Sequence, residues 1–338
     1  MSEFVFPLAA IALTFLVMIP LLTLASRWVL HLRRSRETVW AHFGSEGTFA
    51  LLLAPSAIPL LWLVSSSVHQ SEPWRALEAC VIDHINDENC LDALALSSGL
   101  ALGLLLLTVL RARRETPRFH GTPLGHDHWL QRRLHRLANS SDVLTGLRIT
   151  VLADASEPVF TTGWFKTECF MDARFVETSD DRMLSAALLH ESAHMRSFDN
   201  LRAFLIRLAL LVNPAGKWLR SDFARWQQAR EADCDSHAVH QGGEALALAQ
   251  SIIQAAKFRA VDTCPRGALA LCGPNMTALR LRVALLFEGP PEPQTTRGHL
   301  ILSAAVVVAV VLPHIEPTAF LDHFHFTVER LVHSHSST

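Results

Sequence analysis

Two histidines and a glutamate have the types and the spacing to form a hydrolytic metal site. In the stretch LLHESAHMRSFDN, His190 and His194 are four residues apart, and Glu191 directly follows the first of them. Four residues of α-helix turn through about 400°, so the two imidazoles lie about 40° apart and can bind one ion. Glu191 lies beside that ion, where hydrolysis needs a general base. Two unrelated histidines on a surface helix are the alternative.

A third ligand is expected about forty residues downstream. A catalytic Zn²⁺ site with two histidines needs one more protein ligand and keeps a fourth position open. In QAREADCDSHAV, Glu231 and Asp235 are one helical turn apart on the same face. Glu231 is predicted to bind one Zn²⁺ per chain, and Asp235 to accept a hydrogen bond from the outer nitrogen of a ligand histidine. A solvated acidic helix face is the alternative.

These residues must be positioned by a small set of helices and strands. Thr178 or Ser179 can cap a helix that carries the histidine pair. Gly242 and Gly243 are expected to end the helix that carries Glu231. The predicted elements are helices at 129–139, 221–240, 244–260 and 276–287, a strand at 147–153, and two strands within 158–172 joined near Gly163.

Four long apolar runs predict transmembrane helices. The runs cover residues 4–30, 48–68, 94–110 and 300–313, and about 20 apolar helical residues cross a bilayer core. Residues 1–110 are therefore expected to form three spans with an acidic extracytoplasmic loop at 70–92. Residues 298–315 are expected to form a fourth span, followed by a short extracytoplasmic tail at 316–338. Buried core helices are the alternative.

Arginine-rich segments follow the first and third apolar runs, and they orient the chain by the positive-inside rule. Both termini are then expected outside, and residues 111–297 are expected to form a cytoplasmic domain. Within that domain, 201–214 is apolar but contains two arginines, which favours an interfacial or re-entrant segment that contacts lipid. Cys80 and Cys90 share the outer loop and form either a disulfide or two free thiols. The net charge of −2 gives no reason to expect a nucleic-acid partner.

The combined motifs resemble those of the BlaR/MecR-type integral-membrane zinc metallopeptidases, which are relatives of the CAAX prenyl proteases and the heat-shock membrane proteases. The resemblance covers about residues 155–239. It rests on H-E-x-x-H followed by Arg196 and Asp199, and on E-x-x-C-D at Glu231, Cys234 and Asp235. It implies a mainly α, multi-span helical membrane protein of the bacterial inner membrane, with a cytoplasmic α+β zincin-like metallopeptidase domain. No lysine follows a serine in the S-x-x-K pattern, so the family's penicillin-binding sensor domain is not expected.

The predicted function is zinc-dependent endoproteolysis of a protein or peptide substrate at the cytoplasmic membrane face, in regulatory or quality-control proteolysis. Glu191 is the predicted catalytic base. The alternative is a catalytically silent membrane signalling or scaffold protein that retains a zinc-binding domain. The sequence does not indicate an oligomeric state.

Two further groups of residues are assigned provisional roles. Many zinc peptidases stabilise the oxyanion with a tyrosine, and this chain has none. The candidates for that role are His237, Arg230 and Asn200. The expected substrate-binding edge strand comprises Lys166, Thr167, Glu168, Cys169 and Phe170, to which an extended peptide could pair; an ordinary internal strand is the alternative. Arg196 and Asp199 are expected to form a structural ion pair.

Overall fold

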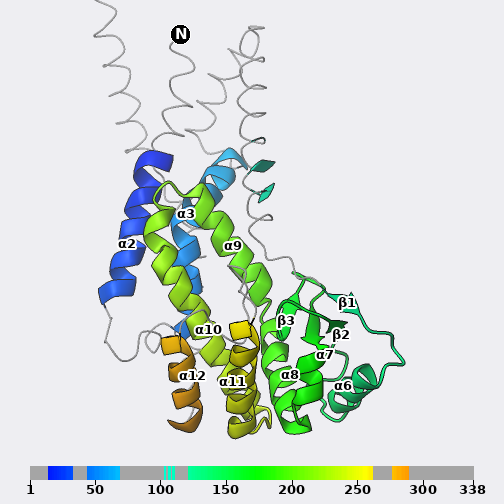
Figure 1. Cartoon of the computed structure of the whole chain (residues 1–338). Coiled ribbons are helices and arrows are strands. Elements are labelled where there is room, and N and C mark those ends of the chain that lie inside the picture. The colour runs from blue at the N-terminus through cyan, green and yellow to red at the C-terminus, as the bar shows by residue number, and fades with distance from the viewer. Residues whose placement is uncertain are drawn as a thin grey trace, which may run out of the picture.

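The computed structural model describes residues 14–32, 44–68, 103, 106–107, 109–110, 121–261 and 276–288, and these parts are mostly helical with one small sheet. Long helices form an upper bundle, and a lower half combines helices with the sheet (Figure 1). Helix α10, Arg220–His240, belongs to both, because it packs against α3 above and against α8 below. The two halves are therefore joined through one continuous helix.

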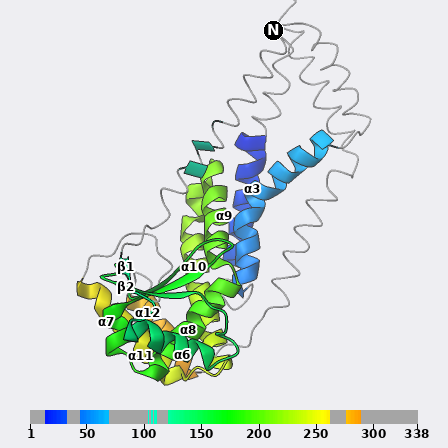
Figure 2. The same cartoon turned by 90° about the vertical axis from the view of Figure 1, so that its right-hand side faces the viewer.

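The upper bundle consists of α2, Ile19–Leu32, with α3, Gly44–Val68, α9, Asp199–Val212, and the first part of α10. Figure 2 shows α3, α9 and α10 side by side from a second direction. The core between them contains the fully buried Trp226 and Leu219, with Phe49, Leu52 and Ile206 around them. A short π-helical segment, η1, Thr14–Met18, precedes α2, and a 3-10 turn, η2, Gly216–Leu219, precedes α10.

The lower half is built around α8, Asp181–Arg196, which is buried along most of its length. Helix α10 and α11, Ala245–Val261, pack against it, and α12, Met276–Glu288, packs against both of these helices. Helix α6, Trp129–Asn139, and the short α7, Ala173–Thr178, join α8 to the sheet. Apolar residues of all these helices and of the sheet form one core, so α8 is held on several sides.

The sheet has the strand order β1-β2-β4-β3. Its strands are β1, Thr122–Pro123, β2, Ile149–Ala153, β3, Val159–Thr162, and β4, Glu168–Asp172. Strand β4 runs parallel to β2 and antiparallel to β3. The prediction of an edge strand at 166–170 is therefore wrong. Lys166 and Thr167 precede β4, and β4 is internal because β2 pairs with one of its sides and β3 with the other. The edge strand of this hairpin is β3.

A tight turn joins β3 and β4 at Gly163, as the sequence predicts. Gly163 has φ +92°, and a Cβ at this position would lie 2.1 Å from the carbonyl oxygen of Lys166. Only glycine fits such a turn without strain, because it has no Cβ and adopts positive φ freely. The sequence signal for the hairpin therefore has a direct steric cause.

Helix α8 begins slightly later than predicted. Its N-cap is Asp180, whose side chain accepts a hydrogen bond from the Met183 amide at 2.8 Å. Thr178 ends α7, and Ser179 lies between the two helices. Asp180 is a better N-cap than Thr178 or Ser179, because its carboxylate also complements the positive end of the helix dipole. The predictions for α6, β2, α10, α11 and α12 agree with the structure to within one or two residues at each end.

The prediction of a multi-span membrane protein is wrong. Among the described residues, no helix is both long and apolar enough to cross a bilayer. Helix α2 has 14 residues, about 21 Å of helix, against a bilayer core of about 30 Å. The first turn of α3 carries the polar Ser45 and Glu46. The predicted multi-pass location in the bacterial inner membrane rested on such spans and is wrong for the same reason.

The segment at 201–214, predicted as interfacial or re-entrant, forms α9 and its C-terminal cap. It packs against α3 and buries Ala203, Phe204 and Ile206. Several other predictions lie outside the described residues: most of the run at 94–110, the loop at 70–92 with Cys80 and Cys90, the span at 298–315 and the tail at 316–338.

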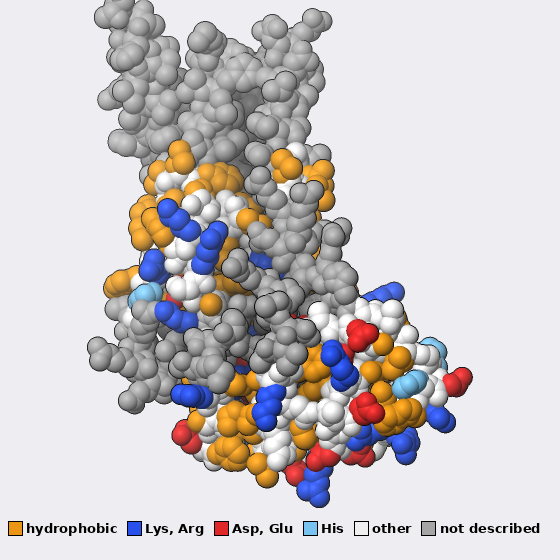
Figure 3. All heavy atoms as spheres, in the orientation of Figure 1, with side chains coloured by type: hydrophobic (Ala, Val, Ile, Leu, Met, Phe, Trp, Pro, Cys, Tyr) orange, Lys and Arg blue, Asp and Glu red, His pale blue; other side chains and the backbone are white. Residues whose placement is uncertain are grey.

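The surface differs between the two halves. Exposed apolar side chains, including Leu21, Leu24 and Trp28, gather on α2, and charges of both signs are intermixed over the lower half (Figure 3). Intermixed charges do not create the broad single-sign field that attracts polyanions or polycations. Several charged side chains of the lower half are instead buried, among them Glu191, Glu231, Asp235 and Arg282.

Candidate metal centre

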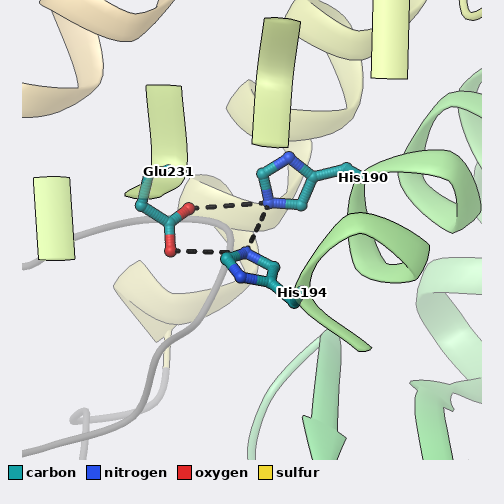
Figure 4. A group of neighbouring side chains, drawn as sticks. All are labelled: His190, His194 and Glu231. Carbon is teal, nitrogen blue, oxygen red and sulfur yellow. Dashed lines mark hydrogen bonds and ion pairs between the residues drawn. The ribbon is translucent and has the colours of Figure 1, made fainter. Parts of the chain in front are cut away.

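The two histidines of α8 and the glutamate of α10 meet inside the protein. Their side chains point toward one another across the gap between the two helices (Figure 4). The Nε2 atoms of His190 and His194 are 3.1 Å apart. Glu231 places Oε2 3.6 Å from His190 Nε2 and Oε1 3.6 Å from His194 Nε2. Three potential ligand atoms, from residues 41 positions apart at most, thus converge on one point.

This group could hold a metal ion. His190, His194 and Glu231 are all buried, and one ligand atom from each lies within 4.8 Å of the others. Glu231 Oε1 and Glu191 Oε2 are buried and have no hydrogen-bond partner among the described residues. Buried carboxylate oxygens without partners are costly, and a cation beside them removes that cost. The donor set of two imidazoles and one carboxylate suits a divalent transition metal.

Asp235 lies behind His190, as predicted. Its Oδ1 is 2.9 Å from His190 Nδ1, on the side of the ring opposite Nε2. Such a contact holds the proton on Nδ1 and leaves the lone pair on Nε2 available for a metal. Asp235 is itself held by Arg282 of α12, whose Nε and Nη2 donate to its two oxygens at 2.7 Å each.

Asp199 has the same role behind His194. His194 Nδ1 lies 2.7 Å from Asp199 Oδ2, and Arg230 donates to both oxygens of Asp199 from Nε and Nη2 at 3.0 Å. The predicted structural pair of Arg196 and Asp199 is therefore wrong. Arg196 instead donates to the Val143 carbonyl oxygen at 2.7 Å. Each of the two histidines is thus backed by an aspartate that an arginine orients.

The arrangement behind His194 extends to the N-terminus of α3. Arg230 Nη1 donates to Ser45 Oγ at 3.2 Å, and Ser45 donates in turn to Asp233. In the next residue of α3, Glu46 accepts a hydrogen bond from Arg202 of α9. The upper bundle therefore contacts the metal centre through polar side chains as well as through apolar packing.

The pKa values of Glu191 and Glu231 are shifted in opposite directions. Burial raises the pKa of the Glu191 carboxyl, although the nearby His194 and His190 act in the opposite sense. Burial would also raise the pKa of Glu231, but Arg282 and the two histidines outweigh it and lower that pKa. At neutral pH Glu231 is thus an anion suited to a cation, whereas Glu191 is a stronger proton acceptor than an ordinary glutamate.

A second cluster could also offer metal ligands: His194, Asp199 and Cys234. Cys234 Sγ lies 3.4 Å from His194 Nδ1, but that nitrogen already contacts Asp199. Arg230 also occupies both oxygens of Asp199. A guanidinium in this place opposes a second cation, so the cluster is best understood as support for His194.

None of the three predicted oxyanion donors is placed for that role. Arg230 is fully engaged by Asp199 and its neighbours. Asn200 donates to the Thr161 carbonyl oxygen of β3 at 3.1 Å, which holds the edge strand against the start of α9. His237 is six residues after Glu231 in α10, which puts it on a different face of that helix. Each of these side chains therefore serves another purpose or lies away from the ligand atoms.

The sequence missed two supporting residues. Asp199 is close in sequence to His194, but α8 ends at Arg196 and Phe198 adopts a left-handed conformation with φ 52°. That turn brings Asp199 back to His194. The sequence motif includes Asp199, but the expected partner was Arg196 and not the histidine. Arg282 is 47 positions from Asp235 and is brought there only by the packing of α12 against α10.

Comparisons with known proteins do not assign the chain to a family. No model of a known protein family matches the sequence, and no curated protein matches it either. The chemistry of the centre is therefore inferred from its residue types and from their geometry.

Proposed function

We propose that this protein is a zinc-dependent peptidase with His190, His194 and Glu231 as metal ligands. The observation that carries the proposal is the convergence of these three buried side chains beside Glu191, whose Oε2 has no hydrogen-bond partner among the described residues. Two imidazoles with one carboxylate form the ligand set of catalytic zinc sites, which keep a position open. The likeness of the H-E-x-x-H and E-x-x-C-D motifs to BlaR/MecR-type peptidases supports the same activity.

Glu191 would act as the general base and then as the general acid. Bound Zn²⁺ would supply Lewis-acid polarisation of a substrate carbonyl and a more acidic water molecule. Glu191 Oε2 would accept the proton of that water and deliver it to the leaving amine. The raised pKa of Glu191 suits both steps, since proton transfer is most efficient when the pKa lies near the working pH.

The substrate would be a peptide bound in extended form. Strand β3 is at the edge of the sheet and contacts α8, the helix that carries the histidines. A peptide that pairs with β3 through main-chain hydrogen bonds would run alongside this helix with little dependence on sequence. Asn200 would have to release the Thr161 carbonyl oxygen for that oxygen to take part in the pairing. In this proposal β3 replaces the segment 166–170 as the site of substrate pairing.

The competing proposal is a catalytically silent protein that uses bound zinc for structure or signalling. The position of Glu191 argues against it, because a carboxylate buried without a partner destabilises the fold. A purely structural zinc site has no need of such a residue and is normally closed by four protein ligands.

The decisive experiment replaces Glu191 by glutamine. Glu191→Gln keeps the size of the side chain and all three ligands but removes the base, so the zinc content should be unchanged. Cleavage of a proteome-derived peptide library, followed by mass spectrometry, should fall at least about 100-fold, the lower range for loss of a general base. Glu177→Gln, at an exposed site on α7, is the matched control and should cleave like the wild type.

The outcomes separate the two proposals. Equal cleavage by wild type and Glu191→Gln would contradict the catalytic role of Glu191. A wild-type protein that binds stoichiometric zinc but cleaves no peptide in the library would favour the silent protein. Zinc content is measured by mass spectrometry of the metal in both cases.

A further inference from the structure

Arg282 is a buried arginine that contacts two acidic side chains of the metal centre at once. Its Nε and Nη2 donate to the two oxygens of Asp235 at 2.7 Å, and its Nη1 lies 2.6 Å from Glu231 Oε2. Only 3% of its surface is exposed. One guanidinium thus bridges Glu231, the proposed third metal ligand, and Asp235, which contacts His190.

The two carboxylates that Arg282 joins are one turn apart on α10. Without a cation between them, Glu231 and Asp235 would repel each other at this separation. A guanidinium is planar and presents its donors in a fixed fork, so it fixes the orientation of its partners as well as their charge. The position of Arg282 therefore determines the direction in which the carboxylate of Glu231 points.

The contact also makes the two oxygens of Glu231 unequal. Arg282 Nη1 forms an ion pair with Oε2, which also lies 3.6 Å from His190 Nε2, whereas Oε1 lies 3.6 Å from His194 Nε2. Both oxygens therefore face the two histidines, and the arginine orients the carboxylate through one of them. The same arginine holds Asp235 against His190 Nδ1, which fixes the tautomer of that histidine.

We propose that Arg282 is a positioning residue that orients Glu231 and Asp235, and through them His190, for binding of the metal ion. This inference rests on the proposed function, because it assigns a role within the same centre. Helix α12 is thereby part of the metal centre, although it supplies no ligand. A small cavity between α10 and α12 is lined by Asp235, Arg282 and the apolar side chains Leu285 and Leu286. The packing of α12 against α10 therefore places Arg282 beside Asp235.

A lysine at this position would keep the charge but lose the fork. An ammonium group is a compact point charge and cannot satisfy Asp235 through two parallel bonds while also contacting Glu231. Arg282→Lys therefore tests whether the metal centre needs the oriented donors of the guanidinium or only its positive charge. Arg280, two residues earlier on α12 and exposed, provides the matched control Arg280→Gln.

The test measures metal binding rather than peptide cleavage. The full chain is stripped of metal, and its affinity for Zn²⁺ is measured by competition with a chromophoric chelator. Arg282→Gln should bind Zn²⁺ about 10- to 100-fold more weakly, the usual effect of removing a residue that supports a ligand. Arg282→Lys should lie between Arg282→Gln and the wild type, and Arg280→Gln should equal the wild type.

A spectroscopic measurement distinguishes positioning from general destabilisation. At saturating Co²⁺, the visible d–d bands report the geometry of the ligands, and they should shift in Arg282→Gln and Arg282→Lys but not in Arg280→Gln. Far-ultraviolet circular dichroism of the metal-free proteins shows whether each variant is folded. If Arg282→Gln does not fold, the comparison is made with Arg282→Lys.

The results distinguish failure of this inference from failure of the proposed function. Unchanged Zn²⁺ affinity and unchanged Co²⁺ bands in a folded Arg282 variant would overturn the positioning role alone. Failure of the wild-type chain to bind Zn²⁺ or Co²⁺ would overturn the proposed function and the positioning role together.

Discussion

At the scale of single residues, the centre repeats one arrangement twice. His190 is backed by Asp235 and Arg282, and His194 is backed by Asp199 and Arg230. In both cases a buried arginine compensates an aspartate that would otherwise be strongly destabilised by burial. The arginines help to lower the pKa values of both aspartates, which favours the anionic form that accepts a hydrogen bond from the outer nitrogen of each imidazole.

The lowered pKa of Asp235 leads to a prediction for the stability of the metal-free protein. Burial alone would raise this pKa, but Arg282 and His190 lower it from 3.8 to about 2. A pKa depressed by folding stabilises the folded state above pH 4, and this contribution is lost as the pH falls toward 2. A shift of this size corresponds to about 2 kcal/mol. Urea unfolding between pH 6 and pH 2.5 should show the loss.

Asp235→Asn provides the comparison for this prediction. The variant cannot titrate at position 235, so its free energy of unfolding should depend less steeply on pH over the same interval. Parallel curves for the wild type and Asp235→Asn would show that Asp235 is not the group responsible.

At the scale of elements, α10 has the largest share of the site. It supplies three of the side chains. Glu231 contacts His190 of α8, Arg230 contacts Asp199 of α9, and Asp235 contacts Arg282 of α12. Residues 231 and 235 share a face because they are one turn apart, and residue 230 extends that face toward Asp199. A small rotation of α10 would therefore move all three side chains together.

The hairpin of β3 and β4 is the element that the proposed substrate would contact, and Gly163 sets its shape. Gly163→Ala should destabilise the folded protein by at least about 1 kcal/mol, because alanine does not tolerate this positive φ and its Cβ would collide with the Lys166 carbonyl oxygen. Gly125→Ala, at a site where an added Cβ meets nothing within 4 Å, should have little effect. Denaturant unfolding of both variants measures the difference; equal stabilities would show that the turn adapts.

Most helices and strands could be predicted from the sequence, because the residues that begin and end them are close together in the chain. The glycines at 242 and 243 end α10: Gly242 has φ +95°, and the amide of Gly243 donates to the Ala238 carbonyl oxygen at 2.9 Å. The strand order was not predictable in the same way. Whether β4 is internal depends on its parallel pairing with β2, and the paired residues, such as Ile149 and Cys169, are far apart in the sequence.

The candidate ligands were also easier to find in the sequence than the residues that contact them. Helical periodicity places His190 beside His194 and Glu231 beside Asp235 without reference to the rest of the fold. The pairing of α8 with α10, and the arrival of Arg282 and Ser45 from distant helices, depend on side-chain packing between separate elements. The apolar runs at 4–30 and 48–68 were interpreted as spans from hydropathy alone. Their described parts instead form helices that pack against each other and, for α3, against α9 and α10.

At the scale of the whole molecule, one apolar core joins the upper bundle to the helix that carries Glu231. Trp226 is fully buried on α10, with Phe49 of α3 and Phe223 near its ring. Trp226→Ala should lower the free energy of unfolding by about 3–5 kcal/mol, the usual loss for a large buried aromatic side chain. Trp218→Ala, at a partly exposed tryptophan with 36% exposure, should cost clearly less.

Both tryptophan variants are compared by denaturant unfolding and by Zn²⁺ affinity. Because α10 spans the two halves, Trp226→Ala should also weaken metal binding, whereas Trp218→Ala should not. A loss of stability without any change in affinity would show that the upper bundle and the metal centre are energetically independent.

The order of the helices along the chain also bears on the timing of biosynthesis. The ribosome releases α8 and α10 before α12, and Arg282 follows Asp235 by 47 positions. A nascent polypeptide that has released both histidines and Glu231 therefore still lacks the arginine that orients Glu231 and Asp235. Full affinity of the centre for a metal ion is then expected only after α12 has been synthesised and has packed against α10.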